Sequence, residues 1–198
     1  MLLTEDFYRR RSVTRIAREL LGKGLFTKIS GVTTGGTIVE TEAYSWKEKG
    51  CHAYQNRKTA RNEVMFGNGG LAYVYLCYGI HNLFNVVTNK IGTAEAVLIR
   101  ALQPVEGTLE MMKRTGSTKD NRITSGPGKL TKALGIDRES NGSILQSEKL
   151  WIEDLGAVIR KNEILASPRI GIGYAGADAL LPWRFTLKNN SWVSKTSY

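Results

Sequence analysis

A carboxylate and an aromatic ring stand close together in one short stretch of the sequence. Glu40, Glu42 and Tyr44 alternate within residues 37–44, a run rich in β-forming residues that predicts a strand. Side chains along a strand point to its two faces in turn, so these three share a face. A carboxylate beside a stacking surface is suited to act as a general base. We favour Glu42, which is nearer Tyr44; Glu40 either shares the task or makes a supporting hydrogen bond.

Tyrosines and basic residues follow this strand. Tyr73, Tyr75 and Tyr78 occupy a predicted strand, 71–78, that pairs with 83–88 through a turn near residues 79–82. The loop before it holds three basic residues, Arg57, Lys58 and Arg61. Aromatic side chains interleaved with basic ones are what base stacking and phosphate contact require. Packing of the tyrosines in a core is the competing interpretation.

Other motifs carry less information. Residues 171–176 match G-x-G-x-x-G, but no βαβ unit surrounds them, so we expect a closely packed strand rather than a dinucleotide site. Residues 126–129 form a glycine-rich helix start with a lysine, which either holds a phosphate or is a simple helix cap. His52 and His81 are too few to build a catalytic zinc site.

Charge favours a polyanionic partner. The 198 residues include 28 Lys and Arg against 18 Asp and Glu, a net charge of +10, which suits nucleic acid or an anionic membrane. No signal peptide or apolar run of membrane-spanning length is present, so we expect no membrane association. Cys51 and Cys77 indicate neither a disulfide nor a zinc site, and we expect a reducing compartment.

Most of the expected strands are joined by turns or loops rather than by crossover helices. We therefore expect a single α+β domain over residues 1–198, with a mainly antiparallel curved sheet, flanking helices and a protruding β-hairpin. We expect a helix over 13–21, capped by Ser12 and ended by Gly22. Strand 37–44 should leave a turn at Gly35-Gly36, and Pro104 should open a helix. A short helix over 129–134 ends at Gly135. The remaining strands are expected at 96–102, 150–152, 169–172 and 183–187.

Ordered blocks over nearly the whole chain resemble the alkyladenine (3-methyladenine) DNA glycosylase family. The first is the strand Ile38-Val39-Glu40-Thr41-Glu42-Ala43-Tyr44. The others are residues 61–66, 73–79, 85–86, 96–102, 126–130, 169–173 and 192–194. Each block is short, and it is their order and spacing that make the resemblance specific. The chain has Ala60 and Gly69 where some members carry proline, a difference of loop stiffness.

The resemblance implies a role for each matching position. Glu42 would activate water, and Arg100 would help to position that water. Tyr78 would enter the duplex where a base has left. Asn85 would crowd the amino group of normal guanine. The walls that sandwich the extruded base would be Tyr44, His52 and Tyr75.

The expected protein is thus a monofunctional DNA N-glycosylase of base excision repair. It would flip alkylated purines out of double-stranded DNA, hydrolyse the N-glycosidic bond and leave an abasic site, without metal or cofactor and as a monomer. Backbone contacts are expected from Arg57, Lys58, Arg61 and Lys129. We expect it in the cytoplasm at the nucleoid of a prokaryote, or in a eukaryotic nucleus. A non-catalytic nucleic-acid-binding protein and a carbohydrate hydrolase remain as alternatives, and the range of lesions stays open.

Overall fold

A computed structural model describes residues 1–119 and 122–195 and confirms the α+β class. Its strands are β1 (Gly24–Ile29), β2 (Val32–Ser45), β3 (Ala72–Cys77), β4 (His81–Thr88), β5 (Glu95–Glu106), β6 (Leu150–Glu153), β7 (Ile164–Ser167) and β8 (Arg184–Leu187). The α-helices are α1 (Glu5–Tyr8), α2 (Val13–Glu19), α3 (Thr108–Thr115) and α4 (Pro127–Leu134). Short 3-10 helices are η1 (Tyr54–Asn56), η2 (Glu63–Phe66), η3 (Arg138–Ser140), η4 (Lys161–Glu163) and η5 (Gly173–Leu180).

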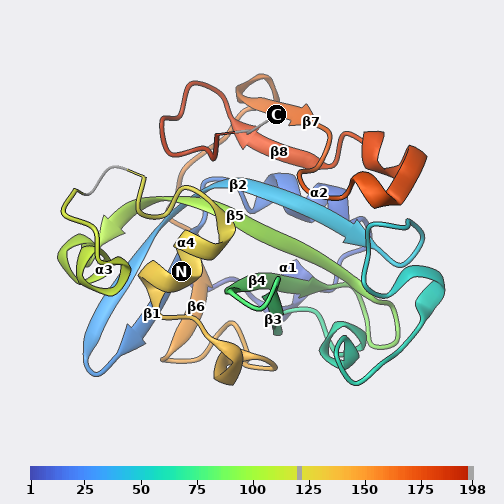
Figure 1. The fold of residues 1–198 in the computed structure, drawn as a ribbon, viewed down its shortest axis with the longest axis horizontal. Coiled ribbons are helices and arrows are strands. Elements are labelled where there is room, and N and C mark those ends of the chain that lie inside the picture. Colours follow the sequence, from blue (N-terminus) through green and yellow to red (C-terminus); the bar gives the residue numbers. More distant parts are fainter. Residues whose placement is uncertain (120–121, 196–198) are drawn as a thin grey trace.

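The strands form one antiparallel sheet of eight, in the order β3-β4-β5-β2-β1-β6, with β8 beside β2 and β7 beside β8. In Figure 1, β2 and β5 cross the molecule as its two long strands, with β7 and β8 above them. Strand β2 changes partner along its length: residues up to Thr37 pair with β1, whereas Glu40–Glu42 pair with β8. A bulge between Ile38 and Glu40 separates the two parts, and bulges bend and twist the strand that carries them.

The two faces of the central strands bury different clusters. Ala43 of β2, Val74 of β3 and Val97 of β5 belong to the large core, together with the apolar stripe of α2. Their neighbours Tyr73 and Ala96 belong to a smaller cluster beneath the loop that follows β2. Because side chains alternate with period two, one face of the sheet packs into the large core and the other lies against that loop.

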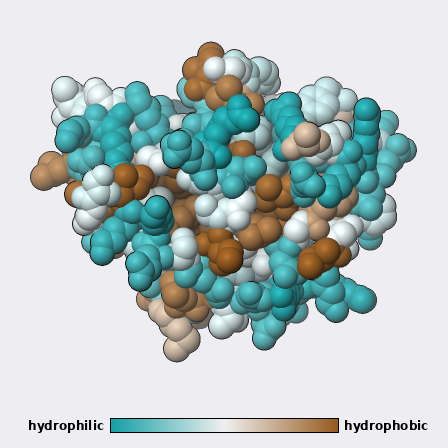
Figure 2. Space-filling model, turned by 90° about the horizontal axis from the view of Figure 1, so that it is seen from below, coloured by the Kyte–Doolittle hydropathy of each residue, from teal (hydrophilic) through white to brown (hydrophobic). Residues whose placement is uncertain are grey.

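Several local predictions are confirmed. Strands β3 and β4 form the expected hairpin, although its turn is residues 78–80, one position earlier than predicted. Helix α4 ends at Gly135, which has a left-handed φ of +69°. Helix α2 begins at Val13 as periodicity predicted, but it ends at Glu19 rather than at Gly22, and Ser12, with a φ of +82°, makes no side-chain cap. On the face shown in Figure 2, hydrophobic residues gather in the middle between hydrophilic ones, and further hydrophobic residues reach the edge of the view.

Two predictions about turns and helices are wrong. Gly35 and Gly36 lie inside β2, and the turn is at Ser30-Gly31, where both φ angles are positive, as a two-residue hairpin loop requires. Pro104 lies in β5 opposite Gly36, next to a bulge and beyond the residues of β5 that pair with β4, where a missing N–H is tolerated. The helix, α3, begins only at Thr108, after Gly107 with a φ of +72°.

The expected strand at 169–172 is also wrong. Residues 168–172 form a loop between β7 and η5, in which Gly171 has a φ of +77°. The backbone of this loop forms a hydrogen bond with a side chain of β2, as described next.

Candidate active site

A cavity of about 680 Å³ opens on the face of the sheet toward the loops. Its wall includes residues of the β3–β4 hairpin, β5, the first turn of α4 and the loop 170–174. Most of the residues singled out from the sequence line it, namely Tyr44, His52, Arg61, Tyr75, Tyr78, Asn85, Arg100 and Lys129. Its volume lies in the range of sites that hold small molecules or single bases.

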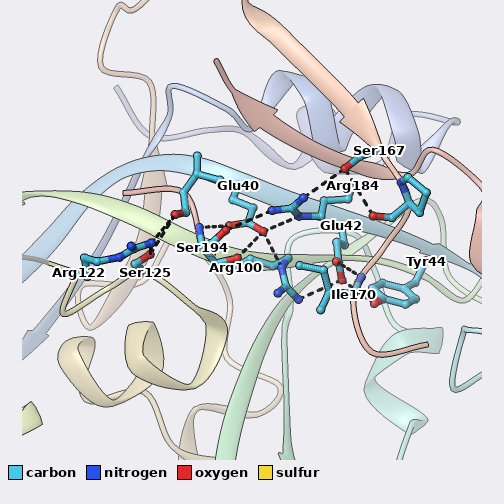
Figure 3. A network of polar contacts seen from close by, with 12 residues as sticks. Glu40, Glu42, Tyr44, Arg100, Arg122, Ser125, Ser167, Ile170, Arg184 and Ser194 are labelled. Atoms are coloured by element: carbon cyan, nitrogen blue, oxygen red, sulfur yellow. Dashed lines mark hydrogen bonds and ion pairs between the residues drawn. The ribbon is translucent and has the colours of Figure 1, made fainter. Parts of the chain in front are cut away.

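Glu42 lies directly behind this wall, with no exposed surface. One carboxylate oxygen, Oε2, accepts a hydrogen bond from the Tyr44 hydroxyl at 2.8 Å and lies 3.4 Å from Nη1 of Arg100. The other, Oε1, accepts from the backbone N–H of Ile170 at 2.8 Å. All three partners line the cavity, so the carboxylate is held one layer below the cavity surface by groups that face it (Figure 3).

Tyr44 is fixed on both sides. Its hydroxyl donates to Glu42, and the Arg169 guanidinium lies over its ring at 4.7 Å from the centroid. Burial raises the pKa of Tyr44, and the negative charge of Glu42 raises it further, so the phenol stays protonated. Arg169 is in turn held by Glu48 through two short contacts of 2.7 and 2.8 Å.

Arg169 and Glu48 were not assigned a role from the sequence. They are separated by 121 positions, and nothing local to either residue indicates the pair. The one available signal is that Arg169 begins the block 169–173, which also carries the Ile170 N–H.

Another part of the cavity wall, formed by Tyr73, Tyr75 and His52, is aromatic. The rings of Tyr73 and Tyr75 lie 5.4 Å apart, which confirms that they share a face, and the His52 ring lies 4.5 Å from Tyr75 at 68°. His52 Nδ1 is 2.9 Å from the Tyr73 hydroxyl. His52 is an exposed residue, yet desolvation beside these rings, and then the positive charge of Arg61, lower its pKa from 6.5 to about 4. His52 is therefore neutral at pH 7.

Asn85 lies on β4 at the back of the cavity and is buried. Its amide nitrogen donates to the Tyr73 carbonyl at 3.1 Å, and this contact fixes the orientation of the amide.

Tyr78 stands at the tip of the β3–β4 hairpin on the rim of the cavity. It is 86% exposed, and its φ of +50° places it in the left-handed region beside Gly79. Ile80, the next apolar side chain of the tip, is 73% exposed. Tyr78 therefore has no role in the core, which decides against the competing interpretation for this tyrosine.

Of the four basic residues expected to contact a DNA backbone, two line the cavity and two do not. Arg61 lies at the cavity with its guanidinium 5.4 Å from the Tyr75 ring centroid, and Lys129 lies in the first turn of α4. Lys58 is instead 3.0 Å from Glu63, outside the cavity wall, and Arg57 is exposed in the same loop.

The glycines before Lys129 allow a close approach. Gly126 has a φ of +124°, and a Cβ on Gly128 would lie 2.8 Å from the His81 ring. This segment is thus a helix start that lies against the hairpin.

The other functional candidates are limited by position. Glu40 is fully buried and bonded to Arg100, Arg184 and Ser194, away from the cavity wall.

Within residues 1–119 and 122–195 no three His, Cys, Asp or Glu side chains are grouped as a metal ion would require. None of the helices described there is long and apolar enough to cross a membrane. Cys51 and Cys77 are unpaired thiols.

Comparison with known proteins gives a consistent result. The sequence model of a family described as "Methylpurine-DNA glycosylase" matches residues 6–191. A protein of Carboxydothermus hydrogenoformans is 48% identical over 195 residues, which are 98% of this chain and 100% of the relative. A protein of Methanocella arvoryzae is 49% identical over 197 residues, which are 98% and 96% of the two chains. Both relatives carry the name "Putative 3-methyladenine DNA glycosylase".

Proposed function

The chain belongs to the methylpurine-DNA glycosylase family, and we propose that it flips alkylated purines out of double-stranded DNA and removes them with a water that Glu42 activates. As a DNA glycosylase it is a hydrolase acting on N-glycosyl bonds. Membership decides against a non-catalytic binder and a carbohydrate hydrolase. The observation that carries the proposal is the position of Glu42, whose three partners all face an aromatic cavity.

The carboxylate has room for one further donor. A carboxylate offers about four acceptor sites. Tyr44 and Ile170 each donate a hydrogen bond to one oxygen of Glu42, and Arg100 forms an ion pair with Oε2 at 3.4 Å. The site that remains is on Oε1, beside the Ile170 backbone. A water bound there can pass its proton to Glu42 as it attacks the anomeric carbon of the sugar. The ionised carboxylate also stabilises the positive charge that develops on the sugar as the base leaves.

The aromatic walls suit a cationic base. Alkylation at N3 or N7 gives the purine a positive charge, which improves its stacking on electron-rich rings such as Tyr44 and Tyr75. His52 belongs to the same wall, and because it is neutral it does not repel that charge. The charge also makes the purine a good leaving group, so one carboxylate suffices where other glycosidases need two.

Extrusion of the base requires a substitute in the stack. Unpairing costs a few kcal/mol, and the exposed Tyr78 at the hairpin tip can fill the gap and delay the return of the base. Arg61 and Lys129 flank the cavity where the phosphates of the flipped strand would lie. Within residues 1–119 and 122–195, the aromatic cavity has Tyr78 on its rim, and we propose that a single copy of the chain acts on the duplex.

Direct measurement of base release tests this function. A duplex with one 3-methyladenine or 7-methylguanine is incubated with excess protein, and the free base and the abasic site are quantified. We expect both products in equal amounts, and none from the matched undamaged duplex. Tight binding of the damaged duplex without release of a base would contradict the proposal.

A further inference from the structure

Glu40 is the second carboxylate of the catalytic strand, and both of its oxygens accept hydrogen bonds within the protein. Its Oε1 accepts from Nε of Arg100 at 2.8 Å, Nε of Arg184 at 2.7 Å and Oγ of Ser194 at 2.8 Å. Its Oε2 accepts from the backbone N–H of Ser194 at 2.7 Å. Three donors crowd Oε1 and one reaches Oε2, and the side chain is fully buried outside the cavity wall, so Glu40 is out of reach of a substrate in the cavity. It is therefore unsuited to share the role of base.

Arg100 connects the two carboxylates (Figure 3). Its Nε is bonded to Glu40, and its Nη1 lies 3.4 Å from Oε2 of Glu42. The guanidinium is planar and rigid, so the contact that fixes Nε also fixes the direction of Nη1. Arg100 also faces the cavity, and Glu40 thus determines how Arg100 presents itself both to Glu42 and to the cavity.

Arg184 belongs to the same cluster through the sheet. It stands directly opposite Glu42 in the β2–β8 register, so their side chains lie on one face, although its Nε is bonded to Glu40. Ser194 closes the cluster from the C-terminal segment. Two carboxylates and two guanidiniums are thereby buried together with no net charge.

We propose that Glu40, Arg184 and Ser194 are positioning residues that hold Arg100 against Glu42 and set the pH range in which Glu42 works as the base. The inference rests on the proposed function of Glu42. It assigns to three residues outside the cavity wall a control over the chemistry within it.

The charges around Glu42 give this control a sign. Charged and titratable groups reach it from every neighbouring element: Tyr44 and Glu40 of β2, Tyr75 of β3, Arg100 of β5, Arg184 of β8, and Arg169 with its partner Glu48 from the loops. Burial favours the neutral form of Glu40, but Arg100 and Arg184 outweigh burial and hold the pKa of Glu40 below its usual value. Glu40 therefore keeps its negative charge while Glu42 acts.

Removing the charge of Glu40 and removing the charge of Arg184 change the net charge around Glu42 in opposite directions. Glu40→Gln leaves a positive surplus, which favours the ionised form of Glu42. Arg184→Gln leaves a negative surplus, which favours the protonated form. Single-turnover base release from an alkylated duplex, measured from pH 4 to 9, reports these changes as a shift of the acid limb. We expect the limb to move by about one pH unit, downward in Glu40→Gln and upward in Arg184→Gln.

Glu19→Gln is the matched control, because Glu19 is also a carboxylate paired with two arginines, Arg10 and Arg15, but on α2 and outside the site. Its acid limb should coincide with that of the unmodified protein. A purely structural role of Glu40 and Arg184 predicts the same fractional loss at every pH. Unmoved limbs in both variants, or shifts in the same direction, would overturn the inference.

Two further variants keep the test decisive if Glu40→Gln does not fold. Arg184→Lys retains the charge, so its acid limb should stay in place while that of Arg184→Gln moves upward. Ser194→Ala keeps all four charges and should lower the maximal rate without moving the limb or weakening binding of damaged DNA. An Arg184→Lys limb that moves with that of Arg184→Gln would contradict the role of charge.

Glu42→Gln separates this inference from the function on which it rests. If the unmodified protein has an acid limb that Glu42→Gln abolishes, yet Glu40→Gln and Arg184→Gln leave it in place, only the positioning role fails. If Glu42→Gln retains the rate and the limb of the unmodified protein, Glu42 is not the base, and both proposals fail.

Discussion

Replacement of Tyr78 by alanine should weaken base flipping while leaving the fold intact. Tyr78 is 86% exposed at the hairpin tip, so its truncation removes little buried surface. Surface substitutions of this kind change the free energy of unfolding by about 0.5 kcal/mol or less. A buried tyrosine would instead cost several kcal/mol, which separates a wedge from a core residue by thermal unfolding alone.

The functional loss follows from the energy of stacking. An aromatic side chain that stacks on a base contributes roughly 1–3 kcal/mol, and this is the stabilisation that the flipped state loses when the wedge is removed. The flipped population, and with it the single-turnover rate, should fall by about 5- to 150-fold on a fully paired duplex. Where the lesion lies opposite a mismatch, the base is already partly unpaired, and the deficit should be smaller.

Leu109→Ala is a suitable control, because Leu109 is 81% exposed on α3 and lies outside the cavity wall. It should match the unmodified protein in melting temperature and on both duplexes. An equal loss of rate on paired and mismatched substrates by Tyr78→Ala, or a large fall in its melting temperature, would remove Tyr78 from the wedge role.

Three further predictions concern charge and metal. The His52 ring should titrate near pH 4 by NMR, since its pKa is lowered to about 4. Its contribution to stability is present above pH 6.5 and declines as the pH falls toward 4, and a midpoint near 6.5 would refute its desolvation by the neighbouring rings. DNA affinity should fall steeply with salt, and Arg61→Gln or Lys129→Gln should each reduce the salt slope by about one, whereas Lys58→Gln should change it less because Glu63 already pairs with Lys58. Base release should persist in a strong chelator; loss that a divalent metal restores would contradict a water activated by a carboxylate alone.

Local patterns in the sequence were sufficient for the strands that carry the chemistry. Alternation along β2 and β3 predicted that Glu42 and Tyr44 share a face and that Tyr73 and Tyr75 do so too, as their contacts confirm. It succeeded because period two is a property of the strand itself, independent of the rest of the fold.

Patterns failed where distant segments decide the local conformation. The sequence predicts a strand over 169–172, but the backbone there bonds to a side chain of β2 instead of to a neighbouring strand. The sequence predicts that Pro104 begins a helix, but Pro104 lies in β5 next to a bulge of β2. The contacts of Glu40 with Arg184 and Ser194 join positions separated by 144 and 154 residues, and no periodicity shows such pairs.

The most direct test of the central claim is single-turnover base release by Glu42→Gln at neutral pH. The amide keeps the shape of the side chain but cannot take the proton of the water. The rate should fall by about 10²- to 10⁴-fold, while the dissociation constant for the damaged duplex and the melting temperature stay close to those of the unmodified protein and of Glu19→Gln. A Glu42→Gln variant that folds, binds and still releases base within about tenfold of the normal rate would show that the general base lies elsewhere.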